Sequence, residues 1–200
     1  MKSPQIHLIT DGTISAESFD TDKNELLRIV EAGRSSGISH IHIREKNLNA
    51  RLQFDLVREL AAISKARRPL IFVNGRPDVA ETAGADGVHL PSHSFTVKDI
   101  KKNFPRLQVG ISVHSVKEAA SAEVADADHV YLSPIYASPG KGEPLGLDRL
   151  SAAVKAADVP MIALGGIDES RVQAVLATGA AGFAAIRYLN EFMRARIKTV

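Results

Sequence analysis

Short apolar runs recur along the chain, and segments with a different spacing of hydrophobic positions separate them. The runs are four to six residues long and mostly rich in β-branched residues, which is typical of strands. We expect eight strands, at Ile6–Thr10, His40–Ile43, Leu70–Val73, Gly87–Leu90, Gln108–Val113, His129–Leu132, Met161–Leu164 and Gly182–Ile186.

Between these runs, apolar residues stand three or four positions apart, as on the buried face of a helix. Leu52, Leu56 and Leu60 show this spacing. Each segment is long enough for the crossover helix that parallel strands need. The alternation predicts an α/β fold, a single-domain (β/α)₈ TIM barrel over residues 1–200, with an open doubly wound sheet as the alternative. Because 200 residues is short for this barrel, its helices and loops should be near minimal.

Side chains alternate between the two faces of a strand, and one phase of the expected strands two to six is apolar throughout. That phase should meet the helices. The other phase is expected at the barrel axis and comprises His40, His42, Arg44, Leu70, Phe72, Asn74, Gly87, His89, Gly110, Ser112, His114, Tyr131, Ser133, Ala163 and Gly165. Barrel interiors are usually filled by bulky branched residues, so this small and polar set indicates either a ligand pocket or a buried polar network.

Composition narrows the class of partner. The 25 basic and 23 acidic side chains give a net charge of only +2, which favours a small-molecule ligand over nucleic acid or a membrane surface. The absence of cysteine excludes disulfides, thiolate metal sites and a cysteine nucleophile. No apolar stretch approaches roughly 18 residues, and no signal-like segment is present, so we expect a cytoplasmic protein.

His114 is the candidate acid/base. It ends the fifth expected strand, where barrel enzymes place catalytic groups, and an imidazole both takes up and returns protons near neutral pH. A structural role is the alternative. His7, His40 and His129 are interpreted as structural or exposed, and the spacing of the seven histidines does not indicate a metal site.

A phosphate site is expected after strands seven and eight. Gly165 and Gly166 follow strand seven, where backbone N–H groups can approach an anion, although a tight turn would also require glycine. Arg187 follows strand eight and suits a phosphate, or lies at a helix surface.

Other polar residues stand at the strand ends. Arg44 and Lys46 could bind an anionic group, or form solvated pairs with Glu45. Asn74 can donate and accept hydrogen bonds. The Pro- and Gly-rich segment 133–146 around Lys141 suggests a lid, or a surface loop without a role.

A set of motifs extends over nearly the whole chain: His42-Ile43-Arg44-Glu45, Asn74-Gly75-Arg76, Asp78-Val79-Ala80, Leu90-Pro91-Ser92, Ser112-Val113-His114-Ser115-Val116 and Gly165-Gly166. Together they resemble the thiamine phosphate synthase superfamily, whose members are (β/α)₈ barrels. Synthases of this superfamily carry Asn-Asp after strand three and Gly-Gln-x-Asp after strand four, and both aspartates hold Mg²⁺. Here the matching positions are Asn74-Gly75 and Pro91-Ser92-His93-Ser94, so the chain is more similar to the TenI-type thiazole tautomerases.

The resemblance implies a metal-independent and cofactor-independent isomerase of bacterial thiamine biosynthesis that aromatises a thiazole carboxylate phosphate tautomer. His114 would be the catalytic acid/base. The substrate-binding residues would be Arg44, Asn74, Ser112, Lys141, Gly165, Gly166 and Arg187, the last at a position where the superfamily often has serine. The alternatives are a thiamine phosphate synthase and a non-catalytic regulatory or binding relative. The resemblance also suggests a homodimer. The sequence contains no basic helix that would indicate contact with nucleic acid.

Overall fold

The computed structural model describes residues 3–63, 65–66, 68–92, 94–121, 124 and 126–199. Its strands are β1 (Gln5–Ile9), β2 (His40–Ile43), β3 (Leu70–Asn74), β4 (Gly87–Leu90), β5 (Gln108–Val113), β6 (His129–Leu132), β7 (Met161–Leu164) and β8 (Gly182–Ala185). Every neighbouring pair is parallel, and β8 pairs with β1, so the sheet is a closed barrel in sequence order. The TIM-barrel prediction is confirmed, and the open-sheet alternative is wrong.

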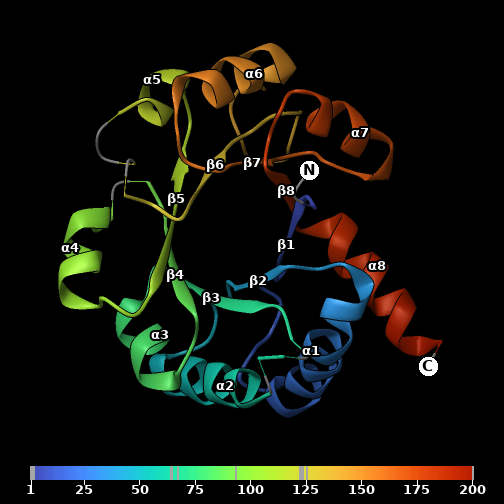
Figure 1. Ribbon diagram of the computed structural model, residues 1–200. Coiled ribbons are helices and arrows are strands. Elements are labelled where there is room, and N and C mark those ends of the chain that lie inside the picture. Colours follow the sequence, from blue (N-terminus) through green and yellow to red (C-terminus); the bar gives the residue numbers. More distant parts are fainter. Residues whose placement is uncertain are drawn as a thin grey trace.

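The helices form a ring outside the strands (Figure 1). They are α1 (Phe19–Gly33), α2 (Ala50–Ala62), α3 (Pro77–Ala83), α4 (Val97–Asn103), α5 (Val116–Ala119), α6 (Gly146–Ala156), α7 (Glu169–Ala177) and α8 (Arg187–Lys198), with a 3₁₀ turn at Arg34–Ser36. Helix α5 has only four residues, and α3 and α4 have seven each, as the short chain requires.

Local sequence explains where several helices begin. The side chain of Asn49 accepts a hydrogen bond from the backbone N–H of Leu52 at 3.0 Å, and Thr96 caps α4 in the same way at 3.1 Å from Asp99. Such caps satisfy N–H groups that have no partner within the helix. The apolar face of α2 then buries Leu56, Val57 and Leu60 against the barrel.

The apolar phase of strands β2 to β6 packs against the helices, as predicted, in one continuous hydrophobic cluster. The prediction for β7 is wrong. Ala163 belongs to this outer layer, whereas Ile162 packs inside the barrel with Tyr131. Every residue of β7 is apolar, so alternation carries no information about which side chains face the axis.

The barrel interior holds an unusual group of rings. His7, His40, His42, His89 and His129 are all buried there, so the alternative that His7, His40 and His129 are exposed is wrong. Gly110 makes room for these rings, because a Cβ atom at that position would lie 2.2 Å from Nε2 of His129. Small residues that face the barrel axis, such as Gly110, therefore leave room for the large histidine rings.

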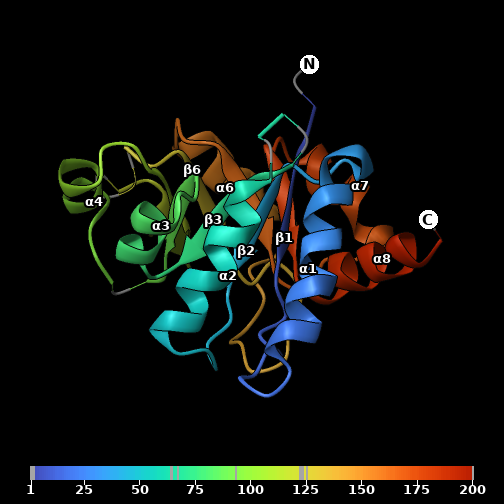
Figure 2. The same cartoon turned by 90° about the horizontal axis from the view of Figure 1, so that it is seen from below.

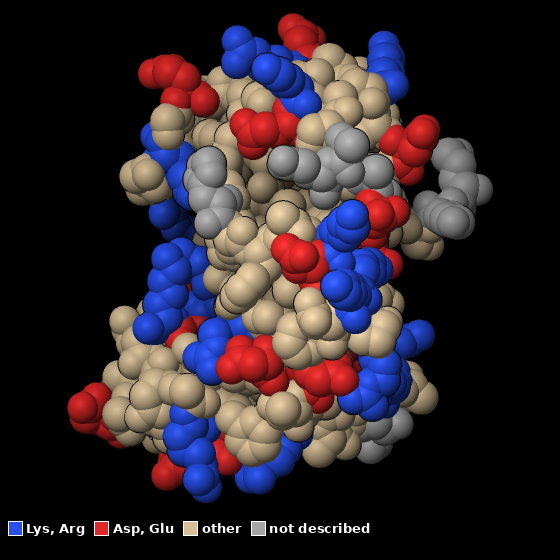
Figure 3. Space-filling view, turned by 90° about the vertical axis from the view of Figure 1, so that its left-hand side faces the viewer, with Lys and Arg blue, Asp and Glu red and all other residues tan. Residues whose placement is uncertain are grey.

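The carboxyl ends of the strands lie opposite the N-terminus, and the long loop after β6 projects at that end (Figure 2). On the face shown in Figure 3, acidic and basic side chains are interspersed, consistent with the small net charge. Among the described residues, no helix combines the length and the apolar character needed to cross a membrane.

Candidate active site

A cavity of about 910 Å³ opens at the carboxyl ends of the strands. It is lined by all eight residues selected from the sequence: Arg44, Asn74, Ser112, His114, Lys141, Gly165, Gly166 and Arg187. The prediction that they come together is therefore confirmed. Their individual roles remain predictions.

The imidazole of His114 has a defined tautomer. Its Nδ1 lies 2.8 Å from the carbonyl oxygen of Ser133, which can only accept, so Nδ1 carries the proton. In the neutral ring Nε2 then carries the lone pair, to which the hydroxyl of Ser92 can donate a hydrogen bond. Nε2 lies 3.3 Å from the hydroxyl of Ser92, and both residues line the cavity. His114 is exposed to the cavity, which makes Nε2 available as a base.

The floor of the cavity is polar and buried. Nε2 of His89 lies 2.8 Å from the hydroxyl of Ser112, and the hydroxyl of Tyr131 lies 2.6 Å from Nε2 of His42. Burial lowers the pKa of His89 to about 3 and also lowers that of His42, so both rings are neutral. Ser112 therefore lines the cavity while its hydroxyl is held by the neutral ring of His89.

Gly165 and Gly166 form the turn between β7 and α7. Their φ angles are +104° and +64°, a region that favours glycine. A Cβ atom at Gly165 would lie 2.8 Å from Cα of Pro134, and one at Gly166 would lie 2.6 Å from the carbonyl oxygen of Ala137. Packing against the loop after β6 thus requires both glycines, whatever else they bind.

Arg171 was not among the sequence candidates, although it lines the cavity. Its guanidinium donates to the carbonyl of Gly166 and lies over the ring of Tyr136, 4.7 Å from the centroid. It thereby joins the glycine turn to the loop after β6. The sequence signal was weak, because Arg171 is one of many charged residues on a helical face, three residues after Asp168.

The alternative in which Glu45 forms solvated pairs with Arg44 and Lys46 is wrong. Glu45 is buried and accepts hydrogen bonds from the backbone N–H groups of Gly12 and Ile14, at 3.3 and 3.0 Å. Burial raises the pKa of Glu45, partly offset by these hydrogen bonds. Within the described part of the chain, Arg44, Lys141 and Arg187 make no ion pair, so their charges are available to an anionic ligand.

The cavity also shows what stands at the positions of the synthase aspartates. Among the described residues, the lining groups from β3, β4 and the loops after them are Asn74, His89, Pro91 and Ser92, none of which is a carboxylate. His93 lies outside the described residues. The carboxylates that do line the cavity are Asp11 after β1, Asp168 after β7 and Glu191 on α8, and Asp11 pairs with Arg194 at 2.8 Å.

The sequence matches the family described as "Thiamine monophosphate synthase" over residues 7–189, which is most of the chain. The chain belongs to this family. It is 35% identical to the "Putative thiamine-phosphate synthase 2" of Aquifex aeolicus, across 96% of this chain and 100% of that protein. It is 36% identical to the "Putative thiamine-phosphate synthase" of Geobacter sulfurreducens, across 90% and 84%.

Comparison with solved structures supports the same family. The thiamine phosphate pyrophosphorylase from Pyrococcus furiosus superposes with a TM-score of 0.78 at 26% identity, covering 98% of this chain and 96% of that one. The phosphoribosylanthranilate isomerase of the same organism, at 17% identity and a TM-score of 0.60, shows the fold alone. Family membership places the protein among enzymes of thiamine biosynthesis. The names of these relatives favour the synthase reaction over the tautomerase reaction.

Proposed function

We propose that the protein is a thiazole tautomerase that aromatises a thiazole carboxylate phosphate. The observation that carries this proposal is the orientation of His114, whose Nδ1 is hydrogen-bonded to Ser133 so that the lone pair of Nε2 faces the cavity beside the hydroxyl of Ser92. A proton shift within one heterocycle needs a positioned base and no charge stabilisation for a pyrophosphate leaving group.

The reaction balances through a single imidazole. Nε2 of His114 removes the proton from the ring carbon that bears the carboxylate. The electrons move through the ring, and the exocyclic ylidene carbon takes up a proton from the resulting imidazolium. The carbonyl of Ser133 stabilises that imidazolium through Nδ1–H. The ring becomes aromatic, and no net proton is gained or lost.

Substrate binding would use the two ends of the cavity. The turn at Gly165 and Gly166 lies near the first turn of α8, where Arg187 begins the helix, and this region suits a phosphate. Arg44 and Lys141 are assigned to the carboxylate or to closing the cavity. Asn74 and Ser112 supply neutral hydrogen bonds.

Thiamine phosphate synthase is the second candidate, and the names of the relatives favour it. This reaction displaces pyrophosphate, whose charge a divalent ion normally neutralises. The positions that resemble the ion ligands of synthases carry Asn74-Gly75 and Ser92-His93-Ser94, which lack a carboxylate. This chain would therefore need another set of ligands for the ion.

The first experiment follows aromatisation of the thiazole tautomer by NMR, with the wild-type protein and His114→Gln. We expect the variant to lose about 10²- to 10⁴-fold in rate while it still binds the aromatic product, because only the base is removed. Ser92→Ala is the matched control, since it removes the hydroxyl near Nε2 and leaves the imidazole, and its rate should fall much less. An unchanged rate in His114→Gln contradicts the mechanism.

The second experiment separates the candidates. The protein is incubated with the pyrimidine pyrophosphate and thiazole phosphate, with and without Mg²⁺, and pyrophosphate is measured. We expect none above background, and tautomerisation without added Mg²⁺. Mg²⁺-dependent release of pyrophosphate with no tautomerisation would establish the synthase instead. Tight binding of the tautomer without turnover would favour a non-catalytic relative. Homodimer formation and cytoplasmic location remain predictions.

A further inference from the structure

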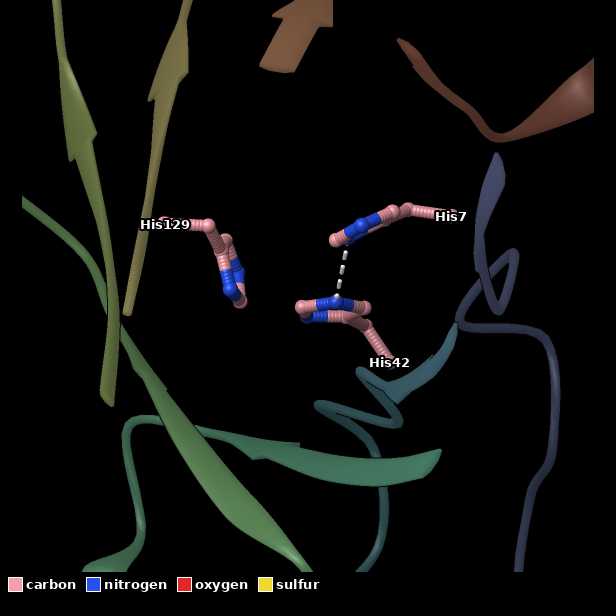
Figure 4. Close-up of side chains that lie close together, drawn as sticks. All are labelled: His7, His42 and His129. Atoms are coloured by element: carbon pink, nitrogen blue, oxygen red, sulfur yellow. Dashed lines mark hydrogen bonds between the residues drawn. The ribbon is translucent and has the colours of Figure 1, made fainter. Parts of the chain in front are cut away.

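The barrel interior beneath the cavity contains donor atoms that the proposed reaction does not use. Three buried imidazoles, from His7 on β1, His42 on β2 and His129 on β6, project toward a common point (Figure 4). Each offers one nitrogen, and these three atoms lie within 4.8 Å of one another. A fourth donor lies beside them, because the hydroxyl of Tyr131 is 2.9 Å from Nδ1 of His7 and 2.6 Å from Nε2 of His42.

Hydrogen bonding alone does not satisfy this group. Nδ1 of His7, Nε2 of His42 and the Tyr131 hydroxyl contact one another pairwise at 3.2, 2.9 and 2.6 Å. A neutral imidazole nitrogen either donates one hydrogen bond or accepts one, and the hydroxyl has one proton, so at most two of the three contacts can be ordinary hydrogen bonds. Nε2 of His129, which lies in the same group, is buried without any partner among the described residues. Unpartnered buried polar atoms are costly, which indicates that a ligand is missing.

The protonation state suits a cation. Burial, reinforced by the neighbouring histidines, lowers the pKa of His7, His42 and His129, so the rings are neutral at pH 7 and keep a lone pair each. No carboxylate belongs to this group of converging side chains among the described residues. Imidazole nitrogens without carboxylates favour borderline transition metals over Mg²⁺ or Ca²⁺.

We propose that His7, His42 and His129, with Tyr131 as a phenolate, bind one divalent transition-metal ion of the Zn²⁺ class inside the barrel. Zn–N bonds of about 2.0–2.1 Å in a tetrahedron place the donors about 3.3 Å apart. The 3.2 Å between Nδ1 of His7 and Nε2 of His42 fits this edge, and His129 offers a nitrogen within 4.8 Å of the other two. His42 and Tyr131 line the cavity, so the ion reaches the site from there.

Charge balance gives the proposal a specific signature. A doubly charged ion in a buried site needs an anion, and Tyr131 is the only side chain of the four that can supply one. Its hydroxyl lies 2.9 Å from Nδ1 of His7 and 2.6 Å from Nε2 of His42, close enough to join the same ion. Binding then forms a metal–oxygen bond, breaks the O–H bond of Tyr131, and releases one proton to solvent.

The test uses protein without a polyhistidine tag, stripped of metal and titrated with Zn²⁺ by calorimetry in two buffers of different ionisation enthalpy. We expect one ion and about one proton per chain, and a rise in Tm with Zn²⁺ concentration but not with Mg²⁺. Loss of a direct ligand in His129→Gln should weaken binding by more than the ~10- to 100-fold typical of an outer partner. Tyr131→Phe should abolish proton release.

Two variants serve as controls. His40→Gln changes a buried histidine stacked on His7, 3.8 Å between centroids, whose Nδ1 is already bound to Ser39. His114→Gln removes the other imidazole of the cavity. Both should bind Zn²⁺ like the wild type. No stoichiometric binding, equal binding by His129→Gln, loss of binding in His114→Gln, or no proton release would overturn the proposal. Should His129→Gln fail to fold, imidazole ¹⁵N NMR of the wild type must show shifts at His7, His42 and His129 on adding Zn²⁺.

Discussion

At the scale of single residues, Gly166 combines two demands on one position. Its backbone has a φ of +64°, and the space that a Cβ would occupy is taken by the carbonyl oxygen of Ala137. Gly140, in the loop between β6 and α6, also has a positive φ of +69° but has nothing within 4 Å of that space. The two glycines therefore separate the conformational requirement from the packing requirement.

Gly166→Ala should destabilise the protein more than Gly140→Ala does. Gly140→Ala carries only the cost of the left-handed conformation, about 1–2 kcal/mol. Gly166→Ala adds a backbone clash, for which overpacking costs of ~1–3 kcal/mol are typical. Urea unfolding measures both free energies of unfolding. The KM for the phosphate substrate should rise only in Gly166→Ala, and equal effects of the two variants on both quantities would contradict this account.

At the scale of elements, a buried ion pair joins the connection before β3 to the connection before β4. Arg68 and Asp86 are both buried, with a side-chain separation of 2.5 Å. Arg68 also donates to the carbonyls of Ile63 and Pro69, and Asp86 accepts from the backbone N–H of Ile71 at 2.8 Å. Burial alone would raise the pKa of Asp86, but the hydrogen bonds from Arg68, Ile71 and Lys65 outweigh it and lower the pKa.

Removing one partner of this pair should be costly. We expect Arg68→Met to lower the free energy of unfolding by up to about 3–5 kcal/mol, because buried Asp86 then keeps only the largely exposed Lys65 as a charged partner. The matched control is Arg106→Met, which breaks an ion pair with Glu81 in which Arg106 is 79% exposed, and should cost about 0–1 kcal/mol. Denaturant unfolding of both variants measures the difference. Similar losses of unfolding free energy in the two variants would show that the buried pair does not stabilise these connections.

At the scale of the whole molecule, five neutral histidines occupy the barrel interior together with Phe72 and Tyr131. Their rings contact one another across strands β1, β2, β4 and β6. Burial lowers the pKa of each, to about 4 for His40 and about 3 for His89. The folded barrel therefore excludes protons that the unfolded chain binds.

Stability should fall steeply in acid. Below pH ~6.5 the unfolded chain binds more protons than the folded one, so the free energy of unfolding decreases as the pH falls and is constant above that value with respect to these groups. Each histidine contributes about 1.4 kcal/mol per pH unit in this window. For His40 the loss continues to about pH 4.

Urea unfolding between pH 5 and pH 8, without added metal, measures this profile. The His40→Gln variant should show a shallower slope than the wild type, because one group that binds a proton only in the unfolded chain has been removed. A wild-type stability that does not change between pH 5 and pH 7 would contradict the neutral interior.

Much of the architecture was predictable because it depends on local patterns. All eight strands lie within one residue of their expected ends, since each is a short apolar run between helical segments. The position of His114 at the end of β5 followed from the same pattern. The prediction of which β7 side chains face the axis was wrong because the residues of β7 are all apolar. Arg171 was missed because its contacts with Gly166 and Tyr136 form only in the folded chain.

The order of elements, the closed parallel barrel and the shared location of the eight candidate residues were determined by the sequence itself, because hydrophobic period and strand ends are properties of neighbouring residues. Contacts between distant segments were decided only by the tertiary structure. In the folded chain Glu45 is buried, and the hydrogen bond of Nδ1 of His114 to Ser133 leaves Nε2 on the side of the cavity. The fold also brings His7, His42 and His129 together. These contacts depend on barrel closure, which places β1 beside β8 and gathers side chains from distant strands around one axis.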